Sequence, residues 1–171
     1  VIITAGFGMT AVVNKLQRMM GIRVPERAQD FSLGLPVRRE ENACDEDCPV
    51  VFVTHMEHHS NHTSWLETIA TVEVIPPTEM GLVDLDALAG LLDKYQNRAL
   101  KFASVSACSN VTGIHTPYHQ IACMLHQAGG FCFVDFACSA PYVEINMHPE
   151  EKDARLDAIF FSPHKFLGGP G

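Results

Sequence analysis

The chain has 171 residues, of which 47% are hydrophobic and 19% are charged, so it can form one sizeable core and we expect a single domain. Its formal net charge of -8, with only 12 Lys and Arg, argues against nucleic acid as a partner, because nucleic-acid-binding proteins need a basic face. No apolar stretch is long enough to span a membrane and no signal-peptide features are present, so we expect a cytoplasmic protein without a membrane partner.

Short apolar runs alternate with amphipathic stretches along the chain. This alternation is typical of βαβ units and predicts a three-layer α/β fold, in which a mostly parallel sheet has helices on both faces. The predicted strands are residues 1–4, 50–54, 71–75, 102–106, 131–135 and 158–161. The predicted helices, which have apolar residues at spacings of three and four, are residues 10–20, 64–68, 86–95 and 117–127.

The segment 23–48 interrupts this alternation. It is rich in Pro, Arg and acidic residues without clear periodicity, which indicates a surface excursion. Cys44 and Cys48 lie in its acidic part, which disfavours a thiolate, so we expect exposed loop thiols and no redox pair. The other four cysteines fall in or beside apolar segments and are expected to be reduced; they are Cys108, Cys123, Cys132 and Cys138.

Two chemically suggestive residues follow predicted strands. Lys165 lies directly after the strand 158–161, and Asp135 ends the strand 131–135, where open α/β sheets bind their ligands. An amine there can attach a cofactor covalently, and a carboxylate can keep a pyridine nitrogen protonated, so the pair suggests a pyridoxal phosphate site. Taken singly, Lys165 can be a surface lysine and Asp135 a strand-end cap.

A glycine-rich turn, Gly6-Phe7-Gly8-Met9-Thr10, joins the first predicted strand to the first predicted helix. Backbone amides of the first helical turn and the Thr10 hydroxyl can hold a phosphate at the helix N-terminus. Thr10 can equally be an ordinary N-cap. Ser162 and His164, in the loop of Lys165, can supply further phosphate donors.

Imidazoles are dense between positions 55 and 62. His58 and His62 have the i, i+4 spacing of two ligands on one helix face, so a metal-binding module or metal-dependent hydrolase is an alternative function. However, the H-E-x-x-H order is absent and no third ligand is evident. The other possibilities are a solvated cluster or one imidazole stacked on a cofactor ring. Asn110 follows the strand 102–106 and can donate to a phenolate oxygen or simply form a turn.

Four segments, taken in order, resemble the class V aminotransferase and cysteine desulfurase family of fold-type I pyridoxal phosphate enzymes. They are residues 57–61 with Trp65, residues 109–113, residues 134–135 and residues 162–165. The resemblance implies a large cofactor-binding domain like that of aspartate aminotransferase, a homodimer and an amino acid substrate. The small domain, which in the family carries the substrate-carboxylate Arg and the desulfurase Cys, is expected to be absent from this chain.

The resemblance also implies roles for individual residues. Lys165 would attach the cofactor, Asp135 would pair with the pyridine nitrogen, and His58 would stack on the ring. Asn110 would approach the ring oxygen or the substrate. The phosphate would be held by the Met9 amide and by the side chains of Thr10, Ser162 and His164.

One position departs from the family pattern. The family usually follows the aspartate with Gly-Ala-Gln, whereas this chain has Phe136-Ala137-Cys138. Cys138 is a weaker hydrogen-bond partner for the ring oxygen than Gln. Transamination, desulfuration and elimination share all the residues named above, so the reaction stays open, and a non-catalytic relative is a further alternative.

Overall fold

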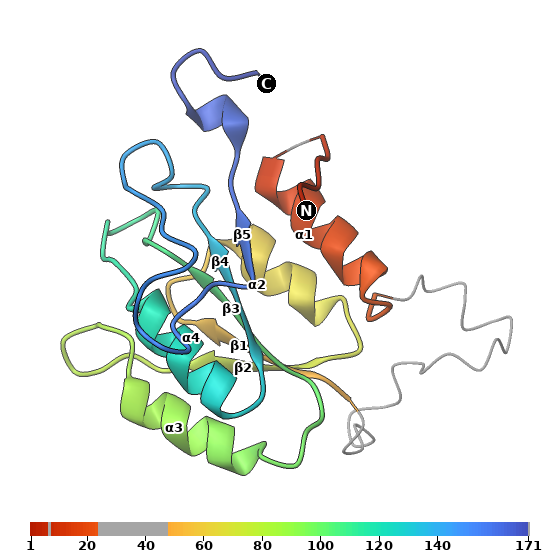
Figure 1. Cartoon of the computed structure of the whole chain (residues 1–171), viewed down its shortest axis with the longest axis vertical. Coiled ribbons are helices and arrows are strands. Elements are labelled where there is room, and N and C mark those ends of the chain that lie inside the picture. The colour runs from red at the N-terminus through yellow and green to blue at the C-terminus, as the bar shows by residue number, and fades with distance from the viewer. Residues whose placement is uncertain (7, 24–47, 171) are drawn as a thin grey trace, which may run out of the picture.

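The computed structural model describes residues 1–6, 8–23 and 48–170. Five parallel strands form one sheet in the order β2-β1-β3-β4-β5 (Figure 1). The strands are β1 (Val50–Thr54), β2 (Thr71–Ile75), β3 (Lys101–Ser106), β4 (Phe131–Asp135) and β5 (Ala158–Phe160). The helices are α1 (Gly8–Met19), α2 (His59–Leu66), α3 (Leu85–Lys94) and α4 (Tyr118–Gln127), followed by the 3-10 turn η2 (Pro163–Lys165).

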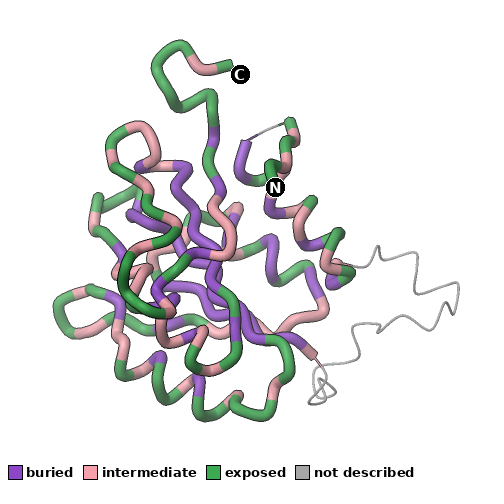
Figure 2. The backbone as a smooth tube through the Cα atoms, in the orientation of Figure 1, coloured by how far each residue is buried: buried purple, intermediate pink, exposed green. Residues whose placement is uncertain are grey.

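The central strands are apolar on both faces. Every residue of β1 and β3 is buried, which is expected of a parallel sheet covered by helices on both sides. Figure 2 shows this buried layer running through the middle of the molecule. The predicted three-layer α/β fold is therefore confirmed.

One face of the sheet packs against α3 and α4. Val50 and Phe52 of β1 point to this face, because side chains alternate along a strand. They share a core with Leu88 of α3 and with Ile121 and Leu125 of α4. None of the helices in the described ranges has the length and hydrophobicity needed to cross a bilayer.

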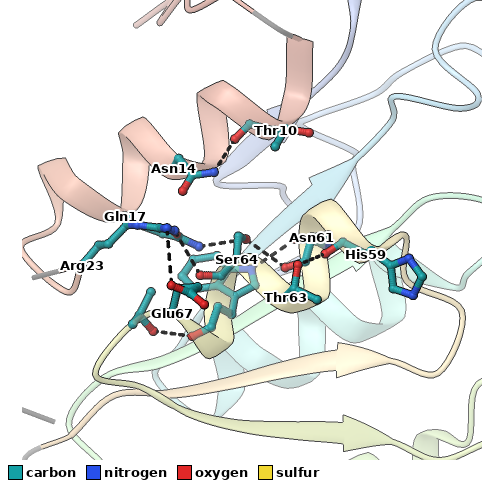
Figure 3. Close-up of polar contacts among 11 residues, drawn as sticks. Thr10, Asn14, Gln17, Arg23, His59, Asn61, Thr63, Ser64 and Glu67 are labelled. Carbon is teal, nitrogen blue, oxygen red and sulfur yellow. Dashed lines mark hydrogen bonds and ion pairs between the residues drawn. The ribbon is translucent and has the colours of Figure 1, made fainter. Parts of the chain in front are cut away.

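The other face packs against α1 and α2. Val51 and Val53 of β1 share this second core with Val13 of α1 and Trp65 of α2. A buried hydrogen bond also joins the two helices, since the Gln17 side-chain amide donates to the Ser64 hydroxyl at 3.1 Å (Figure 3). These contacts fix α1 on the sheet, and with it the start of α1.

The first predicted strand, 1–4, is wrong. These residues form no strand, and the side chains of Val1 and Ile2 are exposed. A short apolar run becomes a strand only where a neighbour accepts its backbone hydrogen bonds, and the two edges of this sheet are β2 and β5. The helix predicted at 64–68 begins five residues earlier, at His59, and the remaining boundaries agree or differ by one or two residues.

The cysteines of the described residues can be compared with the two groups predicted, the reduced thiols in apolar segments and the exposed loop thiols. Cys108 and Cys132 are buried and Cys123 and Cys138 are half-buried, and all four are free thiols as expected. Cys48 is half-buried, contrary to the prediction of an exposed thiol, because Arg98 donates to its carbonyl at 2.9 Å and holds it beside β1. Cys44 and the rest of the predicted surface excursion up to residue 47 lie outside the described residues.

Candidate functional site

A pocket of about 220 Å³ opens at the carboxyl ends of the strands. This is the edge at which open α/β sheets bind ligands. All nine residues predicted to form the site line it, namely Met9, Thr10, His58, Asn110, Asp135, Cys138, Ser162, His164 and Lys165. The sequence analysis did not select the other four lining residues, which are Ser60, Ser106, Cys108 and Ala137.

Asp135 is the buried acid of the pocket. It ends β4, its exposed fraction is 6%, and one carboxylate oxygen accepts a hydrogen bond from the Ala137 backbone N–H at 2.8 Å. Burial raises the pKa of Asp135 to about 6, and the negative charge of Glu57 adds to the rise. The Ala137 N–H and the positive charge of Lys165 oppose it. A cationic group entering the pocket would therefore stabilise the ionised carboxylate.

Lys165 lies at the end of the turn η2, just beyond β5. The turn is closed by the Lys165 N–H, which donates to the Ser162 carbonyl at 3.0 Å, and Pro163 begins it. The Lys165 side chain is exposed to the pocket, and its ammonium group has no hydrogen-bond or ion-pair partner among the described residues. The amine is thus available to react with a bound group.

The start of α1 meets the Lys165 loop closely. The Met9 N–H donates to the Ser162 hydroxyl at 3.1 Å, although the two residues are 153 positions apart. Gly8 has a φ of +64°, and a Cβ there would lie 2.6 Å from the Ser162 hydroxyl oxygen and 2.8 Å from a His164 ring carbon. Only glycine therefore fits here. The space beside it combines a helix N-terminus with side-chain donors, as an anion site requires.

His58 caps α2 instead of lying within it. Its backbone is extended, and its Nδ1 accepts the Ser60 N–H at 3.1 Å and lies 2.8 Å from the Ser60 hydroxyl. Because Nδ1 accepts from a backbone N–H, the neutral ring carries its proton on Nε2. The ring faces the pocket from the loop after β1.

His58 is the N-cap of α2, and the His62 N–H donates to its carbonyl at 3.1 Å, so the two residues are one helical turn apart, while the His58 ring is held by Ser60. Throughout residues 1–6, 8–23 and 48–170, no group of three or more His, Cys, Asp or Glu side chains could hold a metal ion. The metal alternative consequently has no geometric support in this part of the chain.

Glu57 is a functional candidate that the sequence analysis did not identify. Its carboxylate accepts the backbone N–H groups of Thr54 at 3.2 Å and Ser106 at 2.9 Å, together with both of their hydroxyls at 2.6 Å. The Asn61 amide donates a fifth hydrogen bond at 2.7 Å. All five groups can donate to the carboxylate, and together they hold it in one orientation.

These contacts replace missing strand pairing. The ladder between β1 and β3 stops at Phe52 and Ala103, although both strands continue. Beyond that point the Glu57 carboxylate accepts hydrogen bonds from the N–H groups of Thr54 and Ser106, the last residues of the two strands. The Asn61 amide donates to the Ser104 carbonyl at 3.0 Å. The side chains of Glu57 and Asn61 thus close the gap between the strands, next to Ser106, which lines the pocket.

Asn110 and Cys138 lie on the loops that follow β3 and β4. Asn110 is in a tight turn whose N–H groups at Val111 and Thr112 donate to the Ser109 hydroxyl, both at 3.2 Å. Both interpretations of Asn110 thus fit its position, because the turn itself places the residue on the pocket wall. Cys138 is half-buried on the same wall, close to Cys108.

Comparison with known proteins gives consistent matches. The family model for class V aminotransferases matches residues 43–171. A probable cysteine desulfurase of Halobacterium salinarum is 36% identical over 125 residues, which cover 71% of this chain and 28% of that protein. A cysteine desulfurase of Haloferax volcanii is 34% identical with the same coverage. The chain therefore spans less than a third of the length of these relatives.

Solved structures agree with this result. A NifS-like protein from Rickettsia africae superposes with a TM-score of 0.60 at 28% identity, over 71% of this chain and 32% of that one. The cysteine desulfurase CsdA from Escherichia coli superposes with a TM-score of 0.59 at 27% identity, over 70% of this chain and 29% of that one.

Proposed function

Because the chain belongs to the class V aminotransferase family, we propose that it forms the large, pyridoxal phosphate-binding domain of an enzyme acting on an amino acid. The observation that carries this proposal is the convergence of Lys165, Asp135 and the start of α1, at Met9 and Thr10, on one pocket. Because the similar proteins are named cysteine desulfurases, we favour sulfur removal from cysteine over amino-group transfer as the reaction.

The start of α1 fits the phosphate of this cofactor. The φ of Gly8 and the short distances from its position to Ser162 and His164 leave room for no side chain. A phosphate can accept from backbone N–H groups at the start of α1 and from Thr10, Ser162 and His164, while the helix dipole favours its charge. These residues would bind and orient the cofactor.

Asp135 fits the pyridine nitrogen. Burial raises the pKa of Asp135 even though Lys165 is near, and a pyridinium N–H would add a positive hydrogen-bond partner for the carboxylate. Asp135 would hold the proton on that nitrogen, with the Ala137 N–H fixing the carboxylate orientation. Pyridoxal phosphate, when bound, supplies an electron sink for a carbanion formed on the substrate.

Lys165 and His58 would act on the bound cofactor and substrate. The Lys165 side chain lines the pocket, so its amine would attach the cofactor and would move the proton at the substrate α-carbon. His58, whose ring is fixed by Ser60, would stack on the cofactor ring. Asn110 and Cys138 would line the side of the ring oxygen.

The decisive test is covalent trapping. Borohydride should fix the cofactor on a peptide containing Lys165, the untreated protein should be yellow, and Lys165→Ala should lose the trapped label while keeping its circular dichroism spectrum. Lys152→Ala, a change at an exposed loop lysine, is the matched control and should trap normally. Label retained in Lys165→Ala would refute the proposal. A colourless protein with stoichiometric zinc, lost on His58→Ala, would support the metal alternative.

We also propose a homodimer in the cytoplasm. Large apolar side chains stay exposed on three loops beyond the carboxyl ends of the strands, with exposed fractions of 85% at Val111, 83% at Tyr142 and 107% at Leu167. A second subunit can cover them. The free thiols of Cys108, Cys123, Cys132 and Cys138 suit a reducing compartment. Sedimentation velocity at micromolar concentration should give a dimer, and a monomer would contradict this proposal.

A further inference from the structure

Two thiols meet at the wall of the pocket. Cys108 lies two residues beyond Ser106, the last residue of β3, and Cys138 lies three residues beyond Asp135, the last residue of β4. Ser106 and Asp135 are directly opposed in the ladder, and the Ala107 N–H continues it by donating to the Asp135 carbonyl at 2.9 Å. The two cysteines therefore leave adjacent strands side by side.

Their surroundings hold the two thiols together and leave Cys138 the more open to the pocket. Both line the pocket and both are free, with Cys108 8% exposed and Cys138 half-buried. Burial raises the pKa of the Cys108 thiol, and Cys138 adds to the rise as a neighbouring charge and as a hydrogen-bond partner. The second effect requires the two sulfur atoms to lie near one another. The Cys108 thiol also donates to the Ser109 carbonyl at 3.6 Å.

We propose that Cys108 and Cys138 form a redox-sensitive modification site, at which a peroxide joins them in a disulfide across the pocket wall. Cys138 is the more accessible and reacts first, because its thiolate attacks one peroxide oxygen and is oxidised to a sulfenic acid while hydroxide leaves. The Cys108 sulfur then attacks the Cys138 sulfur and displaces water. In total two thiols and one hydrogen peroxide give one disulfide and two water molecules.

The crosslink has a consequence for the proposed cofactor site. It would tie the loop of Asn110 to the loop that follows Asp135 and remove the Cys138 thiol from the ring-oxygen side of the pocket. Cofactor binding should therefore be weaker in the oxidised protein and recover on reduction. This second step rests on the proposed function, whereas the formation of the disulfide does not.

The test separates these two steps. The purified protein is treated with hydrogen peroxide, blocked with a thiol alkylating reagent and digested after aromatic residues, since Tyr118 and Phe131 separate the two cysteines. Mass spectrometry should find the peptide of Cys108 joined to that of Cys138, with two hydrogen atoms lost and dithiothreitol restoring both thiols. The joined peptide should be absent from Cys108→Ser and Cys138→Ser and present in Cys123→Ser, the matched control on α4.

Peroxide treatment that leaves both thiols open to alkylation, oxidises Cys138 to a sulfinic acid without a crosslink, or joins a different pair would overturn the proposal. Cofactor absorbance is measured separately. In the wild type, but not in Cys108→Ser, it should fall at least several-fold on oxidation and return with dithiothreitol. A protein that forms the disulfide yet never binds the cofactor would refute the proposed function and leave the modification site standing.

Discussion

Asp135→Asn should make the cofactor-free protein more stable at neutral pH. The wild-type carboxylate is 6% exposed, it accepts one backbone hydrogen bond, and Glu57 repels it. Its pKa rises from 3.8 to about 6. Each pKa unit corresponds to 1.36 kcal/mol, so ionised Asp135 destabilises the folded state by about 3 kcal/mol.

The direction of the pH dependence of the free energy of unfolding follows from proton binding. The folded protein holds the Asp135 proton more tightly than the unfolded chain, so the free energy of unfolding falls as the pH rises from about 4 to about 6 and then levels off. Asparagine stays neutral, and its side-chain oxygen can still accept the Ala137 N–H. We therefore expect Asp135→Asn to raise the free energy of unfolding by up to about 3 kcal/mol near pH 7.5, with the gain vanishing below about pH 4.

Urea unfolding of cofactor-free wild type and variant at these two pH values measures the difference. Asp157→Asn is the matched control, because Asp157 is a well-paired acid that accepts from His126 at 2.7 Å and from the Cys132 N–H at 2.8 Å. It should lose stability at neutral pH. If Asp135→Asn is destabilised near pH 7.5, or shows the same shift at both pH values, the reasoning from burial is incorrect.

Three further outcomes are expected. With cofactor present, Asp135→Asn should still bind it but lose most turnover in a steady-state assay, because a neutral partner does not keep the ring nitrogen charged; near-normal turnover would contradict this role. Gly8→Ala should weaken cofactor binding at least tenfold in an absorbance titration, since its Cβ would lie 2.6 Å from the Ser162 hydroxyl oxygen and displace a side chain that lines the pocket. Gly21→Ala, with a similar φ of +72° and nothing within 4 Å, isolates the backbone strain of about 1–2 kcal/mol and should bind normally. Glu57→Gln should lower the urea midpoint, because hydrogen bonds to a charged group contribute about 1.5–3 kcal/mol each, whereas Glu67→Gln at an exposed site should not.

The family and the sheet could be predicted because their signals are local. Apolar runs at 50–54, 71–75 and 131–135 coincide with the observed strands, and the family model confirms the resemblance drawn from four short motifs. The strand predicted at 1–4 failed because strand formation depends on a neighbouring strand, which the run itself does not reveal. Helix α2 began early because an unusual cap, the ring of His58, satisfies its first turn.

Glu57 shows why part of the site could not be predicted. Its position in the motif 57–61 was a signal, but an acidic residue in a loop is ordinarily solvated. Its role depends on Ser106, 49 residues away, and on a ladder between β1 and β3 that stops before both strands end. The Cys108 and Cys138 contact likewise needs two loops to be adjacent in space, which only the strand order reveals.

The hydrogen bond from the Met9 N–H to Ser162 closes a loop of 153 residues. Such a long-range contact carries a large loop-closure entropy and should form late in folding, after the sheet has assembled. The anion site at Gly8 would then be completed in the last step of folding. A ligand that binds only the completed site draws the whole folding equilibrium toward the native state. Cofactor colour would therefore report complete folding of this chain as well as occupancy.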